Sequence, residues 1–391
     1  MMVPDWVEAS HEPPRWSAKE NSFILTRYAD AAAVLRHPEV QVVELGNEIA
    51  RLGVRWRRTF PNLVTMLGGI LVHRNPPAHT TIRLFLKKSL QNFAADLSES
   101  AMRRSVDSLL DTIPSGEPVD AVHVLATRFP AMTIARALGL EENFVANVMR
   151  TGAQLIGAWH RGSSLKTYER LENEARELSA AMTEKIREQR GMTGGLGRMA
   201  TLGASEFGLD DDEIAAGAFF FIMAGTRTTA MLLGNMMYLL AARPADRERV
   251  MADPGLMKAC IDETMRFAGP LRHVGRVAGP EMCLSSVRIP PGSAIYVKLE
   301  VAHRDPEASE HPERFDIDRR GAPHLGFAAG IHACLGTGLA HLEAATLIST
   351  MFRRFDVELL EASPQWQEHL LFRELAKLPV VLRPISKRKT T

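Results

Sequence analysis

One apolar segment near the middle of the chain constrains the fold more than any other feature. It begins with four acidic residues, 210–213, and continues as "IAAGAFFFIMAG" from Ile214 to Gly225. Acidic side chains favour a helix N-terminus, and a helix that is apolar on all sides must be buried in a large core. The helical pattern continues to Pro244, so we expect a buried helix of about 30 residues.

Charge and cysteine content exclude several classes of protein. Lys and Arg total 47 against 46 Asp and Glu, so the basic excess of a nucleic-acid-binding protein is missing. Cys260, Cys283 and Cys334 are the only cysteines and form no C-x-x-C pair, which argues against a disulfide framework or a four-cysteine metal site. A reducing cytoplasm is expected. The longest apolar run falls short of the roughly 20 residues that span a bilayer, so we expect no membrane anchor.

Helical periodicity dominates the rest of the chain. It is clear in residues 94–113, 126–140 and 171–190. Strand-like pieces bounded by Pro and Gly are fewer and occur at 22–28, 275–279, 282–305 and 377–384. The sequence therefore predicts a mainly α fold with a minor β portion, of the α+β class.

A glycine-rich stretch at 190–208 is expected to be a surface loop. It contains a formal G-x-G-x-x-A match from Gly195 to Ala200, the pattern of a dinucleotide-binding turn. A helical pattern rather than a strand precedes it, and no helix is expected at its end. We therefore do not expect a nucleotide site.

A scarce cysteine lies in a segment of small side chains. Cys334 belongs to "GFAAGIHACLG", residues 326–336. Small residues let a backbone fold tightly around a metal-ligating thiolate. The helical pattern that follows would place Cys334 just before a helix N-terminus, where the dipole stabilises an anion. A buried structural cysteine in a turn is the alternative.

Three further motifs have a structural explanation when each is taken alone. In "DETMR", Glu263 and Arg266 are three residues apart on one helix face and can pair. In "NPPAHTTIR", His79 and Arg83 are one helical turn apart and could bind an anion such as a carboxylate. In "AGTRTT", Arg227 brings a charge into an apolar helix and needs a partner or a function there.

Together these motifs resemble the cytochrome P450 family of haem-thiolate monooxygenases, of the soluble bacterial type. "FAAGIHACLG" matches the haem-binding signature Phe-x-x-Gly-x-His-x-Cys-x-Gly at every fixed position. "ETMR" matches the Glu-x-x-Arg of the K helix, "HTTIR" the His-x-x-x-Arg of the C helix, and "AGTRTT" the I-helix motif except at its acid. The resemblance covers nearly the whole chain. It implies one haem domain over 1–391, with a long buried I helix over the haem and a proximal cysteine loop.

The resemblance implies a role for each matched residue. Cys334 would be the proximal thiolate ligand of the iron in haem b, iron protoporphyrin IX, and thiolate donation favours O–O cleavage. Glu263 and Arg266 would be structural, joined to Arg314 or Arg319. The other implied haem contacts are Phe327 and Gly336 in the cysteine loop, and His79, Arg83, Arg276 and His332 at the propionates.

The resemblance also implies that the hydroxyl of Thr228 relays protons to iron-bound dioxygen. The residue before this threonine is usually an acid in the family, but here it is Arg227. Three interpretations stay open. Arg227 pairs with an acid on a neighbouring helix, or it binds a substrate carboxylate, or it marks a weaker activation of dioxygen with peroxide as the oxidant. The retained Thr228 favours ordinary monooxygenation.

The substrate pocket is expected at the stretch before the C helix, at the I helix and after the K helix. The residues expected to line it are Phe220, Met223, Ala224, Leu271 and Val274. Cationic character comes from Arg55, Arg57, Arg58, Arg272 and His273. These side chains either favour a hydrophobic acid or carrier-bound acyl substrate or simply face solvent.

We therefore expect a monooxygenase that oxidises a small hydrophobic, in one interpretation carboxylate-bearing, substrate with O2. Electrons would come from a ferredoxin and its reductase, because the chain has no flavin or iron–sulfur motif. A bacterial tailoring reaction on a secondary metabolite, terpenoid or acyl compound is the expected role. The alternatives are a peroxide-using peroxygenase in which Arg227 binds a carboxylate, a non-catalytic haem-binding or sensor protein, and a cysteine hydrolase using Cys334 and His332.

Overall fold

The computed structural model of the chain describes residues 11–44, 58–93, 96–157 and 164–385. Internal contacts group the chain into two compact units. Unit 1 consists of Met1–Gln41, Met102–Phe129 and Thr228–Thr391, and unit 2 consists of Val42–Ala101 and Pro130–Arg227. The single haem domain over 1–391 stays a prediction.

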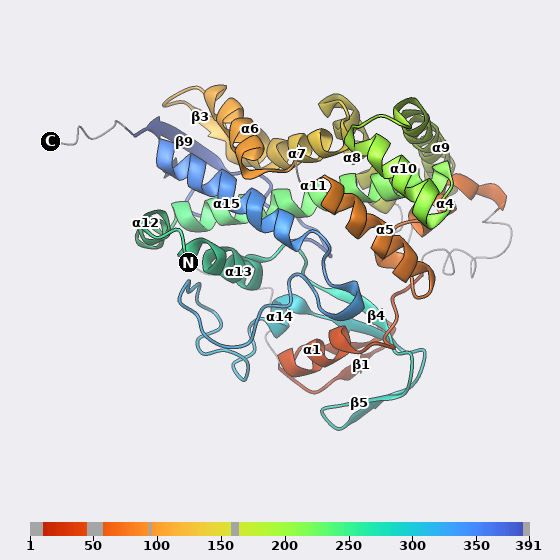
Figure 1. The fold of residues 1–391 in the computed structure, drawn as a ribbon. Helices are drawn as coiled ribbons and strands as arrows, with labels where there is room; N and C mark the ends of the chain where they lie inside the picture. The colour runs from red at the N-terminus through yellow and green to blue at the C-terminus, as the bar shows by residue number, and fades with distance from the viewer. Residues whose placement is uncertain (1–10, 45–57, 94–95, 158–163, 386–391) are drawn as a thin grey trace. The chain divides into compact units, whose positions relative to one another are not determined.

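The long apolar helix predicted from the sequence is confirmed as α11, Asp211–Ala241, with 31 residues (Figure 1). Its first turn holds Asp211, Asp212 and Glu213, where carboxylates stabilise the helix N-terminus. All residues from Met231 to Leu240 are buried. By length and composition α11 could cross a membrane, but its most apolar 18-residue stretch is 61% buried inside the protein, which is typical of a core helix.

Unit 2 is built from helices. They are α4 (Pro61–Gly68), the 3-10 turn η1 (Leu71–His73), α5 (Ala78–Asn92), α8 (Glu142–Gly157), α9 (Leu165–Gln189) and α10 (Gly195–Phe207). Helix α9 packs against α4, α8 and α10, and α10 also packs on α5. Two further helices, α6 (Glu99–Asp111) and α7 (Arg128–Leu138), belong partly to each unit. The helices predicted at 94–113, 126–140 and 171–190 are thereby confirmed.

Helix α10 shows that the prediction of a surface loop at 190–208 was wrong. Its glycines lie where neighbouring chain leaves no room for a side chain. A Cβ atom on Gly195 would lie 1.7 Å from the carbonyl oxygen of Ala137, and one on Gly197 would lie 2.4 Å from that of Gln189. Tertiary packing therefore overrides the poor helix propensity of glycine. The segment before α10 is a helix rather than a strand, as the sequence indicated, whereas the helix that begins at Gly195 itself was not expected.

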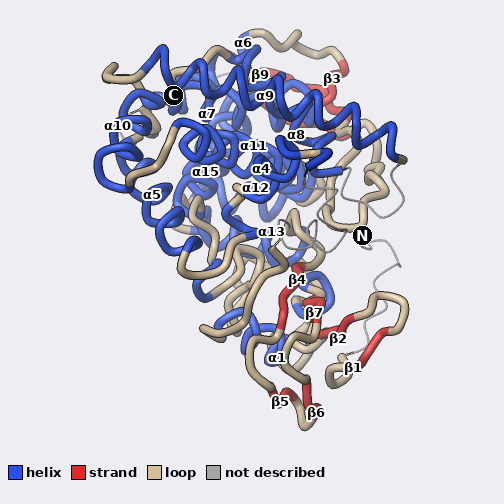
Figure 2. Tube along the Cα trace, turned by 90° about the vertical axis from the view of Figure 1, so that its right-hand side faces the viewer, coloured by secondary structure: helices blue, strands red, loops and turns tan. Residues whose placement is uncertain are grey.

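The strands lie in unit 1 and form three small sheets (Figure 2). The first has the order β1 (Arg15–Ser17), β2 (Ser22–Leu25), β7 (Ala294–Val297) and β4 (Val274–Val277). Strand β7 is parallel to β2 and antiparallel to β4. The second has the order β3 (Pro118–Asp120), β9 (Pro379–Pro384) and β8 (Phe355–Leu359), and the third pairs β5 (Met282–Leu284) with β6 (Val287–Ile289).

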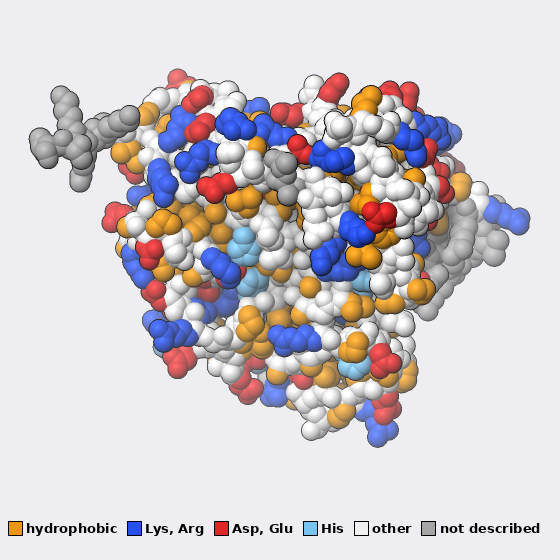
Figure 3. Space-filling view, in the orientation of Figure 1, with side chains coloured by type: hydrophobic (Ala, Val, Ile, Leu, Met, Phe, Trp, Pro, Cys, Tyr) orange, Lys and Arg blue, Asp and Glu red, His pale blue; other side chains and the backbone are white. Residues whose placement is uncertain are grey.

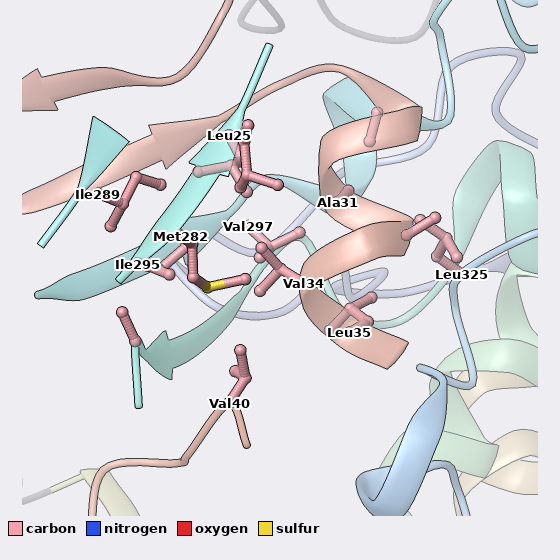
Figure 4. Packing of buried hydrophobic residues seen from close by; sticks show 14 of the residues in the cluster. Leu25, Ala31, Val34, Leu35, Val40, Met282, Ile289, Ile295, Val297 and Leu325 are labelled. Atoms are coloured by element: carbon pink, nitrogen blue, oxygen red, sulfur yellow. The ribbon is translucent and has the colours of Figure 1, made fainter. Parts of the chain in front are cut away.

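A hydrophobic cluster joins the first sheet to α1 (Tyr28–Arg36) (Figure 4). Leu25, Ile295 and Val297 extend from the strands toward Val34 and Leu35 of α1, and each is at most 4% exposed. Burying such side chains stabilises the fold by about 1.5–3 kcal/mol each. The cluster also includes Leu325, which anchors the segment leading to the cysteine loop.

All but one of the remaining helical elements of unit 1 follow α11 in the chain. They are α12 (Pro244–Ala252), α13 (Leu256–Ala268), α14 (Leu299–Ala302), the 3-10 turn η3 (Gly330–His332) and α15 (Thr337–Arg354); the π-helical turn η2 (Val122–Thr127) precedes α7. Helix α13 packs against α12, α14 and α15. Basic and acidic side chains are mixed over the face shown in Figure 3, in keeping with the near-neutral charge. The mainly α fold with a minor β portion is thereby confirmed.

Candidate active site

Cys334 lies in a tight loop between η3 and the N-terminus of α15. Its peptide N–H donates a hydrogen bond to the carbonyl oxygen of Phe327 at 2.8 Å, which closes the loop. The hydroxyl of Thr337, the first residue of α15, donates to the carbonyl oxygen of Cys334 at 3.1 Å. Cys334 itself is exposed. The loop therefore fixes the backbone on both sides of a thiol that stays accessible.

Gly330 shows why this loop needs small residues. Its φ of 69° lies in the left-handed region that favours glycine. A Cβ atom there would lie 2.5 Å from the carbonyl oxygen of Leu35 in α1. The loop therefore packs directly on the α1 backbone, and the glycine of the motif is required by both conformation and space.

The middle of α11 opens on one face. Ala224 is exposed and Thr228, one turn later, is half-buried, although the helix is buried from Met231 onwards. The neighbouring Thr226 is fully buried, and its hydroxyl donates to the carbonyl oxygen of Ile222 at 2.6 Å. Arg227 and Thr228 are thus each partly accessible, whereas the buried Thr226 hydroxyl bonds to the backbone of its own helix.

The predicted propionate-binding residues include a buried cation. Arg276 in β4 is 7% exposed, and burial lowers the pKa of its guanidinium to about 10. Among the described residues no carboxylate lies within ion-pair distance of it; its Nη1 donates to the carbonyl oxygen of Gly275 at 2.8 Å. A buried guanidinium is costly without a counter-charge, so Arg276 fits an anionic group such as a haem propionate.

The other predicted propionate ligands lie in α5 and η3. His79 and Arg83 are one turn apart in α5, as expected. Burial, together with the charge of Arg83, lowers the pKa of His79, so this imidazole is neutral at neutral pH and can donate from one nitrogen. His332 is half-buried at the end of η3, two residues before Cys334.

The family model for cytochrome P450 matches residues 156–380, more than half of the chain. The chain belongs to the cytochrome P450 family. It is therefore a haem-containing monooxygenase, and the cysteine loop of unit 1 suits that cofactor.

Named relatives extend over almost the full length of this P450. It is 29% identical over 380 residues to cytochrome P450 107B1 of Saccharopolyspora erythraea, with 92% of this chain and 89% of the relative covered. It is also 29% identical over 375 residues to the epothilone C/D epoxidase of Sorangium cellulosum, with 93% and 88% covered. The solved structure of epothilone B-bound cytochrome P450epoK superposes with a TM-score of 0.82 at 28% identity, covering 95% of this chain and 94% of the other.

The Glu263–Arg266 pair of α13 is buried, and the structure decides which arginine joins it. Arg319 lies with its Nε 3.2 Å from the Glu263 carboxylate, whereas the Arg314 side chain pairs with Glu313 at the surface. Arg314 contributes only its carbonyl oxygen, which accepts from Arg266 at 2.8 Å. The pair therefore ties α13 to the chain segment before the cysteine loop, the structural role that the sequence indicated.

The predicted pocket residues fall into both units. In unit 2, Phe220 is 9% exposed, Met223 is half-buried and Ala224 is exposed. In unit 1, Leu271 and Val274 are half-buried and pack on the hydrophobic cluster around α1. Their assignment to the substrate pocket stays a prediction.

The cationic residues considered for substrate binding are mostly engaged or outside the described residues. Arg272 holds Glu300 through two hydrogen bonds of 2.9 and 3.0 Å, and Glu300 also binds Arg373. Burial and the charge of Arg272 lower the pKa of His273 to about 4, so it is neutral. Arg58 is exposed, and Arg55 and Arg57 lie outside the described residues.

Sequence reasoning missed a cluster beside the cysteine loop that consists of Asp262, His324, Phe327 and His341. Nε2 of His341 lies 2.8 Å from Asp262 Oδ1, and Nε2 of His324 lies 3.5 Å from the same oxygen. The Phe327 ring lies between the two imidazoles, with centroid distances of 5.3 and 5.4 Å. His324 and His341 are 62 and 79 residues from Asp262 in the chain, so local spacing does not indicate that they share this carboxylate.

Proposed function

We propose that this cytochrome P450 oxidises a small hydrophobic substrate in bacterial biosynthesis, with Cys334 as the proximal ligand of the haem iron. The haem, when bound, supplies the activation of dioxygen. The observation that carries the proposal is the accessible Cys334 thiol, held in a loop closed by its hydrogen bond to Phe327 and followed at once by α15. A helix N-terminus and peptide N–H groups stabilise a thiolate there.

Proton delivery is assigned to Thr228. This residue is half-buried on α11, one turn after the exposed Ala224. A positioned hydroxyl can pass a proton from water to a reacting oxygen. The neighbouring Thr226 is fully buried, and its hydroxyl donates to the carbonyl oxygen of Ile222.

The binding of a substrate carboxylate is assigned to Arg227. This residue is half-buried on α11, three positions after Ala224, so both lie on the same side of the helix. The epothilone C/D epoxidase among the relatives supports a tailoring reaction on a secondary metabolite.

Electrons are proposed to come from a ferredoxin and its reductase in the cytoplasm. Of the two lysines of α5 that could meet an acidic partner, Lys88 forms an ion pair with Glu206 of α10 and lies over the Phe207 ring. Lys87 is exposed, and it is the better candidate for the contact.

Isotope labelling distinguishes this function from its alternatives. The haem-loaded protein is supplied with NADPH, a ferredoxin, its reductase and a hydrophobic substrate under ¹⁸O2. A monooxygenase gives a product that carries one ¹⁸O atom. Product formed only with added H2¹⁸O2 would establish the peroxygenase alternative, and substrate binding without product under either condition would establish a sensor.

A further inference from the structure

The cluster of Asp262, His324, Phe327 and His341 has a defined protonation pattern that its hydrogen bonds impose. In His341, Nδ1 lies 2.9 Å from the carbonyl oxygen of Thr337 while Nε2 lies 2.8 Å from Asp262. Both partners are acceptors, so both nitrogens must donate. His341 is therefore an imidazolium when both bonds are formed.

His324 carries its proton differently. Its Nδ1 accepts the peptide N–H of Gly326 at 3.1 Å, so this nitrogen has no proton. The proton of the neutral imidazole is then on Nε2, which faces Asp262. The two histidines thus face the same carboxylate oxygen, and His341 is the one whose ring nitrogens both face acceptors.

The titratable groups beside His341 come from helix α13 and from the loop before η3. Helix α13 contributes Asp262 and Lys258, which also pair with each other. The loop contributes His324, which in turn faces the neutral, buried His303 at a ring distance of 6.4 Å. Helix α12 also packs on α15, but its Arg247 lies over the Phe352 ring, about 16 Å along the helix from His341 at 1.5 Å per residue. Asp262 is thus the group that holds the His341 proton.

Two contacts connect His341 to the cysteine loop. Its ring packs against Phe327, whose carbonyl oxygen accepts the peptide N–H of Cys334. Its Nδ1 binds the carbonyl oxygen of Thr337, and the Thr337 hydroxyl donates to the carbonyl oxygen of Cys334. Loss of a proton from His341 would remove a positive charge beside the loop. It would also remove one of the two hydrogen bonds that the ring nitrogens of His341 donate.

We propose that His341 is a positioning residue whose positive charge, held by Asp262, raises the reduction potential of the haem iron bound at Cys334. A nearby cation disfavours the more positive ferric state relative to the ferrous state, and charge around the ligand is a main determinant of such potentials. The inference rests on the proposed role of Cys334.

The direction of the pH effect follows from the proton balance. The hydrogen bond to Asp262 raises the pKa of His341 above the ordinary value of 6.5. Below that raised pKa the charge is present and the potential is high. As the pH rises through it, His341 loses its proton and the potential falls.

The test measures the midpoint potential of the haem-loaded protein from pH 6 to pH 9 in wild type and three variants. His341→Arg keeps the positive charge at every pH in this range. Its midpoint potential should therefore stay at the value that wild type has at low pH. His341→Gln has no charge, so its potential stays at the alkaline-side value. Asp262→Asn is expected to move the fall to lower pH, since the carboxylate no longer holds the proton.

His311→Gln is the control, because His311 is a surface histidine whose side chain is 70% exposed. This variant should titrate like wild type. Identical curves for wild type, His341→Arg and His341→Gln would overturn the inference, as would a fall that His311→Gln removes. The carbon monoxide spectrum of every variant is recorded first, because a missing thiolate band would contradict the role of Cys334 rather than that of His341.

Discussion

Glu263 and Arg266 form a buried two-bond ion pair within α13. Nε of Arg266 lies 2.7 Å from one carboxylate oxygen and Nη2 lies 2.8 Å from the other, with the two side chains 4% and 5% exposed. The same carboxylate accepts the peptide N–H of Asp316 at 2.8 Å and pairs with Arg319. One carboxylate thus holds a helix and the segment before the cysteine loop together.

Removing this carboxylate is expected to destabilise the protein strongly. Glu263→Ala leaves two buried guanidinium groups without their counter-charge, so the free energy of unfolding should fall by about 3–5 kcal/mol. Urea unfolding followed by circular dichroism measures it. The control is Asp318→Ala, which removes an exposed two-bond pair with Arg249 and should change stability little. Equal losses in the two variants would contradict the structural role of Glu263.

Thr228→Val is expected to uncouple electron consumption from product formation. The substitution keeps the shape of the side chain and removes the hydroxyl that passes a proton. Product formed per NADPH consumed should fall on the order of tenfold or more, with hydrogen peroxide accounting for the difference. Thr226→Val is the matched control, because that hydroxyl bonds only to Ile222, and it should retain coupling. If both variants behave alike, Thr228 has no special part in proton delivery.

Arg227→Gln separates an acidic substrate from a neutral one. A charge-assisted hydrogen bond contributes about 1.5–3 kcal/mol, so the affinity for a hydrophobic carboxylic acid should weaken by roughly 10- to 100-fold. The affinity for its methyl ester should change little, and Arg227→Lys should recover part of the loss for the acid. Spectral titration of the haem band measures both ligands. An equal change for acid and ester rules out a carboxylate at Arg227.

Arg276→Gln is expected to loosen the haem. The buried guanidinium of Arg276 has no carboxylate within ion-pair distance in the described part of the chain, so a haem propionate would supply its counter-charge. Transfer of haem to an excess of apomyoglobin should become about tenfold faster or more. Arg288→Gln changes an arginine of β6 that is 77% exposed and should leave the rate as in wild type. An unchanged rate in Arg276→Gln would contradict a propionate contact.

The sequence predicted those elements whose pattern is long and regular. The 31-residue α11 is apolar over most of its length and begins with acids, so local composition alone defined it. Strands β1, β3 and β8 were not predicted, because three to five residues with mixed exposure carry too little periodicity. Helix α10 was missed because close packing on the backbone of Ala137 and Gln189 selects its glycines. The local sequence does not show this packing.

The candidate site was predictable where it is one contiguous motif. The segment around Cys334 gave the loop and the following helix, and both are present. The partners of charged residues were not predictable, because they depend on tertiary contacts. Arg272 was expected near the substrate, yet Glu300 holds it, and the imidazolium of His341 depends on an aspartate 79 residues away.

The carbon monoxide spectrum of the ferrous protein tests the central claim most directly. A thiolate ligand from Cys334 predicts the strongly red-shifted Soret band that thiolate ligation gives. Cys334→Ser should lose this band, while Cys283→Ser, which changes an exposed cysteine of β5, should keep it. A red-shifted band that survives Cys334→Ser, or no such band in wild type, would contradict the account.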